Sequence, residues 1–259
     1  MSNGMGKTDY ERIAEVFDRR YQGGAYAGIE QVVLDVLESS PGRRALEVGC
    51  GTGHWLKLLH EHGYEVTGLD ASPAMLEQAR ARLPAATLLH GTAERLPLPD
   101  ARVDGVLCVN ALHHFPDPPA FMAEAFRVLG AGGLLLNIGL DPHRGLDRWF
   151  VYDYFESTRA LDLERFASAD TLKRWLEQAG FLVEGTRLAL RLERGRSAAE
   201  FVAEGGDPRW TSQLAVLPPE AFARGVARIR QEEAEAREKG EALSLTAELH
   251  FWATIARKP

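Results

Sequence analysis

Three glycines and an aspartate have the spacing of a site for a ribose-containing cofactor. Gly49, Gly51 and Gly53 directly follow an apolar run, and a helical pattern begins after them. Glycines let the backbone turn sharply and approach a ligand, and the first amides of the following helix lack helical partners. Asp70 ends the next apolar run, about 20 residues on, where a carboxylate can accept both hydroxyls of a ribose. The alternative for Asp70 is a cap on the helix that begins near Pro73.

The residue at position 54 separates two classes of cofactor. A dinucleotide fingerprint requires G-x-G-x-x-G or A, so a third small residue is expected at position 54. The chain has His54 there, which disfavours a pyrophosphate site. An NAD(P)-dependent oxidoreductase remains as an alternative, supported only by the generic strand–glycine–helix turn.

A histidine pair supplies the strongest candidates for a general base. His113 and His114 follow the apolar run 106–109, and imidazole near neutral pH is suited to proton transfer. The alternative is that one or both pack against the loop and orient it. Weaker candidates are Tyr21, Tyr152, Tyr154 and Glu156. Adjacent histidines cannot easily share one metal ion, so no metal site is expected.

The elements that must hold these residues alternate between apolar runs and helical patterns. Such alternation is typical of a Rossmann-like α/β fold with a mostly parallel sheet. The expected strands are 45–48, 66–69, 87–90, 106–109, 134–138, 181–188 and 251–257. Expected helices begin near Pro73 and cover 119–129 and 169–179, with Asp117 and the prolines after it marking a helix start.

Two long segments interrupt the alternation. Residues 141–167 and 191–246 fit neither pattern, although the second includes a helix from 219 toward 239. Long inserts in a compact α/β domain are usually functional. We therefore expect a single domain over 1–259, in which both inserts and residues 1–30, with a helix over 10–20, form a cap on the substrate side. The aromatic residues at 149–155 suggest a partly apolar acceptor.

Composition limits the partners. The chain has 259 residues, and 30 basic against 37 acidic side chains give a net charge of −7. A net-acidic protein has no global electrostatic reason to bind nucleic acid or an anionic membrane. Two cysteines and no apolar stretch of about 20 residues predict a cytoplasmic protein without a disulfide framework. The charged helix near 219–239 could pack on its own domain or form a homodimer.

The motifs together resemble the class I S-adenosylmethionine-dependent methyltransferases. The resemblance covers roughly positions 43–140. It rests on EVGCGTGHW at 47–55, LDASPAML at 69–76, GTAERLPLP at 91–99, VDGVLCVNALHHF at 103–115 and RVLGAGGLLL at 127–136. It implies a seven-stranded sheet with the last strand antiparallel and helices on both faces. It also implies S-adenosylmethionine as cofactor, S-adenosylhomocysteine as product and a small-molecule acceptor.

The resemblance assigns the methionine part of the cofactor to the end of the first strand. The loop from Gly49 to Gly53, with Cys50 in it, would pass under the methionine. Glu47 would help hold the amino group, and Asn110 would offer it a backbone carbonyl. The alternative for Glu47 is a buried acid paired with a backbone amide.

The resemblance assigns the nucleoside part to three further segments. Asp70 would bind the ribose hydroxyls, and Ala71 and Met75 would lie against the adenine. Ala93 and Glu94 would read the adenine edge, although Glu94 has the alternative of a solvated loop residue. Since a cofactor site does not prove turnover, a non-catalytic S-adenosylmethionine-binding module is the second functional alternative.

Overall fold

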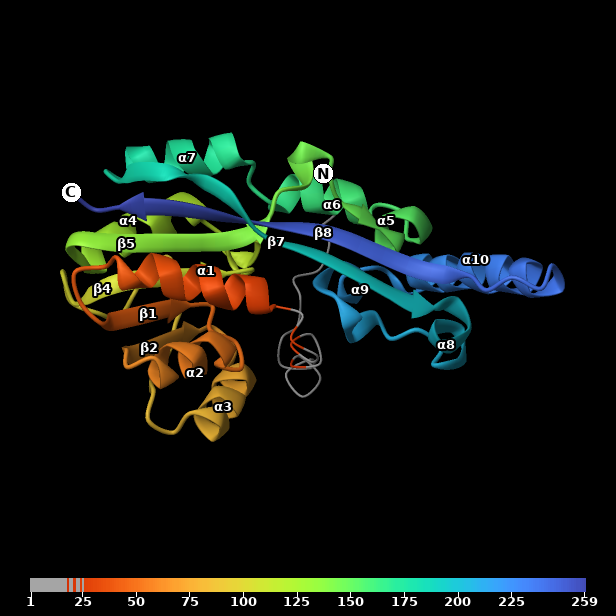
Figure 1. Cartoon of the computed structure of the whole chain (residues 1–259), viewed down its shortest axis with the longest axis horizontal. Helices are drawn as coiled ribbons and strands as arrows, with labels where there is room; N and C mark the ends of the chain where they lie inside the picture. The colour runs from red at the N-terminus through yellow and green to blue at the C-terminus, as the bar shows by residue number, and fades with distance from the viewer. Residues whose placement is uncertain (1–17, 19–20, 22–23, 25) are drawn as a thin grey trace. The chain divides into compact units, whose positions relative to one another are not determined.

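The computed structural model describes residues 18, 21, 24 and 26–259, and their contacts divide them into two compact units (Figure 1). The sheet unit comprises the described residues up to Asp141, together with Phe166–Leu190 and Phe251–Pro259. The insertion unit comprises Pro142–Arg165 and Arg191–His250. The helix expected over 10–20 and most of the segment 1–30 lie outside the described residues.

Five parallel strands and one antiparallel strand build the sheet unit, in the order β3-β2-β1-β4-β5-β8. The parallel strands are β1 (Arg44–Val48), β2 (Glu65–Asp70), β3 (Thr87–His90), β4 (Val103–Val109) and β5 (Leu129–Leu140). β8 (Ser244–Arg257) runs antiparallel to β5 and pairs with β7 (Leu182–Ser197). The predicted mostly parallel sheet with an antiparallel last strand is confirmed, although the sheet has eight strands, because the two-residue β6 (Arg148–Trp149) also joins β8.

Helices cover the sheet in two groups. α1 (Ala27–Glu38), α2 (His54–Glu61) and α3 (Pro73–Arg82) contact one another in sequence order, and α4 (Pro118–Val128) contacts α7 (Ala169–Gln178). The expected helix starts are confirmed: Ser72 caps α3 and Asp117 caps α4, each through its side chain, with prolines in the first turn.

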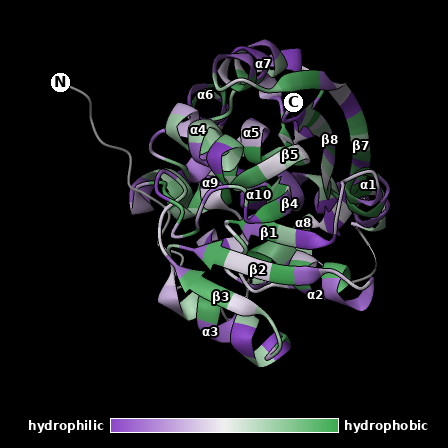
Figure 2. Ribbon diagram, turned by 90° about the vertical axis from the view of Figure 1, so that its left-hand side faces the viewer, coloured by the Kyte–Doolittle hydropathy of each residue, from purple (hydrophilic) through white to green (hydrophobic). Residues whose placement is uncertain are grey.

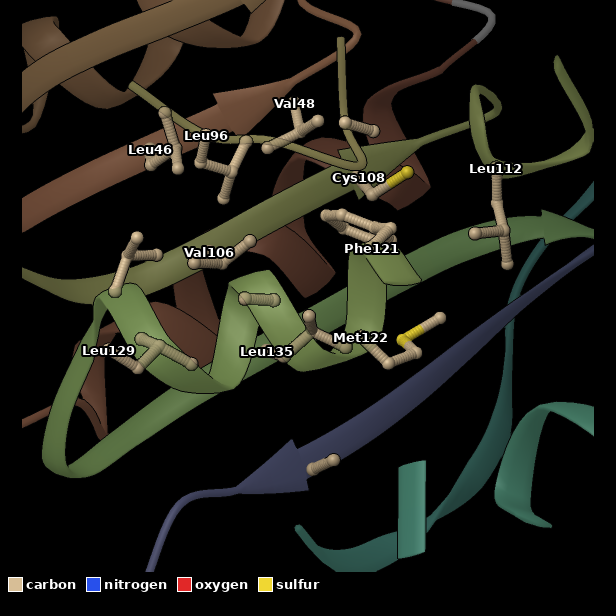
Figure 3. Packing of buried hydrophobic residues seen from close by; sticks show 14 of the residues in the cluster. Leu46, Val48, Leu96, Val106, Cys108, Leu112, Phe121, Met122, Leu129 and Leu135 are labelled. Atoms are coloured by element: carbon tan, nitrogen blue, oxygen red, sulfur yellow. The ribbon is translucent and has the colours of Figure 1, made fainter. Parts of the chain in front are cut away.

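The core of the sheet unit lies where β4 passes between its neighbours. All seven residues of β4 are buried, as a strand covered on both faces requires. Figure 3 shows the α4 side of this core, where Val106 and Cys108 of β4 meet Phe121 and Met122 of α4. The strands of the sheet unit are mostly hydrophobic in Figure 2. This packing fixes the carboxyl ends of β1, β2 and β4, where the predicted site residues lie.

The insertion unit has a core of its own. Its elements are η4 (Pro142–Arg144), β6, α5 (Phe150–Tyr154), α6 (Thr158–Arg165), α8 (Ala198–Ala203), η5 (Pro208–Trp210), α9 (Ser212–Ala215) and α10 (Pro219–Glu238), with parts of β7 and β8. Phe155 and Phe201 are fully buried, and Phe155 stacks on Phe222 with ring centroids 5.5 Å apart. The aromatic side chains Trp149, Phe150 and Phe155 are thus accounted for by burial.

A second feature of the insertion unit is a buried carboxylate with a full set of partners. Asp162 is inaccessible to solvent and accepts hydrogen bonds from Tyr152 Oη at 2.7 Å, Arg165 Nε at 2.9 Å and Gln213 Nε2 at 2.9 Å. These bonds join α5, α6 and α9. Within the segments for which coordinates are described, no helix is long and apolar enough to cross a membrane.

We predict that Gly225→Ala destabilises the protein by about 1–2 kcal/mol. A Cβ at Gly225 would lie 2.3 Å from a ring carbon of the buried Phe155. Overpacking costs about 1–3 kcal/mol and exceeds the gain of up to about 1 kcal/mol from alanine's helix propensity. Urea denaturation followed by circular dichroism measures the change. The control is Gly139→Ala, where a Cβ meets nothing within 4 Å. A Gly225→Ala variant as stable as the wild type would contradict this packing.

Candidate cofactor site and active site

The glycine turn after β1 has a left-handed backbone conformation that is unfavourable for residues with a side chain. Gly49, Gly51 and Gly53 have φ values of +74°, +51° and +77°. A Cβ on Gly49 would lie 2.5 Å from the Cβ of Ala111, which follows β4. Glycine is therefore required at position 49 both for its backbone angle and for the close approach of two loops.

The turn is fixed to the end of β2 by hydrogen bonds. The amides of Gly49 and Cys50 both donate to the carbonyl of Leu69, at 2.8 and 3.0 Å. Asp70 Oδ2 accepts from the amide of Gly51 at 2.8 Å, and Asp70 Oδ1 accepts from the amide of Ser72 at 2.9 Å. Because Ser72 supplies the side-chain cap of α3, Asp70 does not have the capping role considered from the sequence.

Glu47 is the most unusual group of the site. It is 1% exposed, and its Oε2 atom has no hydrogen-bond partner in the described part of the chain. Burial, together with the nearby charge of Asp70, raises the pKa of Glu47 well above its ordinary value, whereas the backbone amide of Leu56 lowers it. The pairing with a backbone amide considered from the sequence is thus present, but it leaves one buried oxygen in need of a donor. A cationic amino group would supply that donor.

His54 fills the position where a dinucleotide site requires a small residue. Its ring stacks on Tyr21 with centroids 3.9 Å apart and nearly parallel planes. Its Nε2 lies 3.4 Å from Glu30 Oε1, and burial lowers the pKa of the imidazole. An aromatic stack thus occupies the place of the third small residue, which agrees with the argument against a pyrophosphate.

The segments expected to face the adenine lie after β2 and β3. Ala71 is exposed, Met75 is buried at 1% exposure, and Ala93 packs into the α4-side core. Glu94 is half-buried, and its Oε1 accepts from the amide of Asp117 at 3.3 Å, so it is tied to the start of α4.

Two residues that fix the adenine-side loop were missed by the sequence analysis. Glu124 Oε2 accepts from the amide of Leu96 at 2.7 Å. Arg127 donates to the carbonyls of Leu96 and Leu98 at 3.0 and 2.7 Å and pairs with Glu124 at 2.7 Å. Arg127 lies in the RVLG motif, but the loop carbonyls to which it donates are 29 and 31 residues away, and nothing in the local pattern indicated them.

Asn110 directly follows β4 and adopts a left-handed conformation, with φ of +50°. Its amide donates to the carbonyl of Ile138 at 2.6 Å, and its buried Oδ1 has no hydrogen-bond partner among the described residues. Residues other than glycine rarely adopt the left-handed conformation, and those that do are concentrated at functional sites.

The histidine pair lies on the short helix η3 (Leu112–His114). The His113 ring stacks on Phe166, with centroids 3.9 Å apart and an interplanar angle of 19°, and its centroid is 3.8 Å from that of His114. His113 lines a cavity at the carboxyl ends of β4 and β5, whereas His114 is not part of its lining. The structure therefore distinguishes the two histidines.

The other candidate nucleophiles and bases are unfavourable. Burial raises the pKa of the Cys50 thiol well above its ordinary value and that of Cys108 to about 12. Burial also raises the pKa of Tyr152, and burial with the Glu232 carboxylate raises that of Tyr154 to about 12. Glu156 lies on the surface beside Arg224. Over the described ranges, no cluster of three His, Cys, Asp or Glu side chains could hold a metal ion.

Comparison with known proteins agrees with this arrangement. Residues 46–137 match the methyltransferase domain family. A protein of Mycolicibacterium smegmatis named "Probable S-adenosylmethionine-dependent methyltransferase" is 37% identical over 181 residues, which are 68% of this chain and 65% of that protein. The malonyl-[acyl-carrier protein] O-methyltransferase of Serratia marcescens is 36% identical over 145 residues, which are 52% of this chain and 55% of that enzyme. The chain thus spans between half and two thirds of the length of these relatives.

A solved structure shows the same fold. The S-adenosylmethionine-dependent methyltransferase of Mesorhizobium loti superimposes with a TM-score of 0.54 at 20% identity, covering 89% of this chain and 98% of that one. Sheet order, glycine turn, family match and relatives agree. The chain contains a class I S-adenosylmethionine-dependent methyltransferase domain.

We predict that Glu47→Gln makes the stability of the ligand-free protein less dependent on pH. Because folding raises the pKa of Glu47 above its ordinary value of 4.5, its contribution is fully present below that value. The contribution is lost as the pH rises through the higher pKa of the folded state. Urea denaturation at pH 5 and pH 8 should show a larger loss on the alkaline side in the wild type than in Glu47→Gln.

The control for Glu47 is Glu61→Gln, which removes a surface carboxylate. This variant should follow the wild-type pH dependence. Parallel curves for Glu47→Gln and the wild type would show that Glu47 has no raised pKa.

Proposed function

We propose that this protein transfers a methyl group from S-adenosylmethionine to a small-molecule acceptor. The observation that carries the proposal is the buried carboxylate oxygen of Glu47, which has no hydrogen-bond partner among the described residues and lies two residues before a glycine turn that is tied to Asp70. Glu47 lies opposite Gly68 on the neighbouring β2, so the two acids belong to adjacent strand ends. Glu47, which would accept a hydrogen bond from an ammonium group, and Asp70, which would accept hydrogen bonds from hydroxyls, therefore both adjoin the glycine turn.

The residues present fit S-adenosylmethionine. Glu47 Oε2 and the carbonyl of Asn110 would hold the ammonium, and Asp70 would hold the ribose hydroxyls. Ala71, Met75, Ala93 and Glu94 would surround the adenine in a loop that Glu124 and Arg127 stabilise. When bound, the cofactor supplies a methyl group activated by a positive sulfur, so the protein has mainly to orient the acceptor and exclude water.

His113 is the proposed general base for an acceptor that arrives protonated. Its ring plane is fixed by the stack on Phe166, and it lines the cavity beside Asn110. A fixed imidazole can take a hydroxyl proton as the bond to the methyl group forms. His114 is proposed to support the ring of His113 rather than to transfer a proton.

The acceptor, compartment and assembly are further parts of the proposal. The net charge of −7 favours a small molecule over nucleic acid, and the protein is proposed to act in the cytoplasm. The enzyme of Serratia marcescens is named for O-methylation of malonyl-[acyl-carrier protein], in which the malonyl group itself is of metabolite size. The insertion unit is proposed to select the acceptor, and the charged helix α10 is the proposed surface for a homodimer.

We predict that Asp70→Ala weakens binding of S-adenosylhomocysteine roughly 10- to 100-fold, because hydrogen bonds to a charged group contribute about 1.5–3 kcal/mol each. Calorimetric titration with S-adenosylmethionine, S-adenosylhomocysteine and NADPH measures the change. Asp35→Ala, which removes an exposed carboxylate from α1, should bind like the wild type. Binding of NADPH alone would return the domain to the dinucleotide-binding class.

We predict that His113→Gln lowers turnover of a hydroxyl acceptor roughly 100-fold or more, in the range typical for loss of a general base. His114→Gln should lower it by less than about 10-fold, since a supporting ring leaves the base in place. Release of S-adenosylhomocysteine is measured with a panel of alcohols, phenols, amines and carboxylates. Equal losses in both variants, with unchanged cofactor affinity, would refute the assignment of the base to His113.

A further inference from the structure

A small cavity lined by both polar and apolar residues lies in the sheet unit, at the carboxyl ends of β4 and β5. Its volume of about 30 Å³ is enough for about two water molecules or one polar group with its attached carbon. The residues that matter for its chemistry are Asn110, His113, Asn137, Asp141, Thr254 and Phe166. None of the motifs recognised in the sequence includes Asn137 as a functional residue.

Asn137 is a polar residue in an apolar row. It stands between Cys108 of β4 and Thr254 of β8, and the preceding residues on its face of β5 and β4, Leu135 and Val106, belong to the core. Asn137 is 6% exposed, yet its Oδ1 has no hydrogen-bond partner in the described structure. An unsatisfied buried polar group destabilises the fold, so a residue of this kind needs a reason other than stability.

A second buried oxygen lines the same cavity. Asn110 Oδ1 has no hydrogen-bond partner among the residues described, and it comes from the neighbouring strand end. The hydroxyls of Thr186 and Thr254 satisfy each other at 2.9 Å. Two amide oxygens from adjacent strands therefore require donors that the described chain does not supply.

The charges around the cavity favour a hydrogen-bond donor and disfavour an anion. Asp141 contributes a carboxylate whose Oδ2 accepts from the amide of Ala169 at 3.1 Å. No lysine or arginine is among the lining residues. A carboxylate ligand would meet the like charge of Asp141 with no lysine or arginine in the lining to offset it. A hydroxyl or amino group could instead donate a hydrogen bond to either unpartnered amide oxygen.

We propose that this cavity binds the hydroxyl or amino end of the methyl acceptor, with Asn137 and Asn110 as hydrogen-bond acceptors for it. The proposal rests on the proposed methyltransferase function and narrows its substrate to alcohols and amines, with carboxylates excluded. Asn110 adjoins the proposed ammonium site through its backbone, and His113 adjoins the cavity through its ring. The donor group of the acceptor is thus held next to the base that would take its proton. Asn137 is then a specificity-determining residue.

The test is a titration of the full-length, ¹⁵N-labelled protein with three probes that share a three-carbon chain: n-propanol, n-propylamine and propionate. The indole N–H of Trp252, which lines the cavity, is the reporter. We expect saturable shifts with propanol or propylamine at roughly millimolar midpoints, as befits ligands of four heavy atoms. Propionate should give no saturable shift. Tighter binding of propionate, or saturable binding of none of the probes, would overturn the proposal.

Asn137→Leu provides the matched variant, because leucine preserves the shape and removes the oxygen. We expect the affinity for propanol and propylamine to fall at least tenfold in this variant, while the affinity for S-adenosylhomocysteine stays within about twofold of the wild-type value. If the wild type binds no S-adenosylhomocysteine, the proposed function fails, but the probe titration still decides whether the cavity takes donors.

A stability control separates a binding role from a structural one. The control is Thr158→Val, which removes a buried hydroxyl that donates to the carbonyls of Val151 at 3.0 Å and Phe155 at 2.8 Å. Thr158→Val should lower the melting temperature, whereas Asn137→Leu should leave it unchanged or raise it. An Asn137→Leu variant as destabilised as Thr158→Val would show that Asn137 serves the fold, and the proposal would be wrong.

Discussion

The contact between the glycine turn and the loop after β4 is the constraint on which the rest of the site depends. Gly49 lies so close to Ala111 that no side chain fits between them, and its amide is bonded to Leu69 of β2. The ends of β1, β2 and β4 are thereby kept in close contact. The positions of Glu47, Asp70 and Asn110 follow, because Glu47 and Asp70 lie at the ends of β1 and β2 and Asn110 directly follows β4. A parallel sheet is suited to this arrangement since all its carboxyl ends meet at one edge.

This edge is also where buried polar groups lack hydrogen-bond partners. Glu47 Oε2, Asn110 Oδ1 and Asn137 Oδ1 are buried oxygens without hydrogen-bond partners among the described residues, and all three lie at or near the ends of β1, β4 and β5. Elsewhere the described chain satisfies its buried acids: Asp162 accepts from three side chains, and Asp104 accepts from the backbone and guanidinium of Arg44. These three oxygens gather at one edge of the sheet, which indicates a site prepared for ligands, whereas the buried Arg196 Nε, also without a hydrogen-bond partner, lies apart in the insertion unit.

The sequence analysis predicted those features that depend on local spacing. The glycine turn after the first strand, Asp70 at the end of the second strand and the helix starts near Pro73 and Asp117 are signals carried by a few adjacent residues, and the structure has each element where it was expected. Features that depend on distant partners were not predictable in this way. Arg127 stabilises a loop 29 to 31 positions earlier, and Asn137 is hidden in a run that reads as a buried strand. The lengths of β7 and β8 were underestimated, because their outer halves leave the apolar sheet and lose the hydrophobic pattern.

The two long inserts show why a cofactor site can be recognised when an acceptor cannot. The cofactor residues lie on segments whose spacing is dictated by the turn, the strand ends and the ribose, so chemistry and sequence pattern are linked. The inserts instead form a unit with its own aromatic core around Phe155 and a satisfied carboxylate at Asp162. Those residues stabilise the packing of the unit, and a packed core can be built from many sequences of similar total volume. The residues that indicate the acceptor are therefore the few buried polar groups that packing does not explain. Among the described residues, Asn137 is the clearest example.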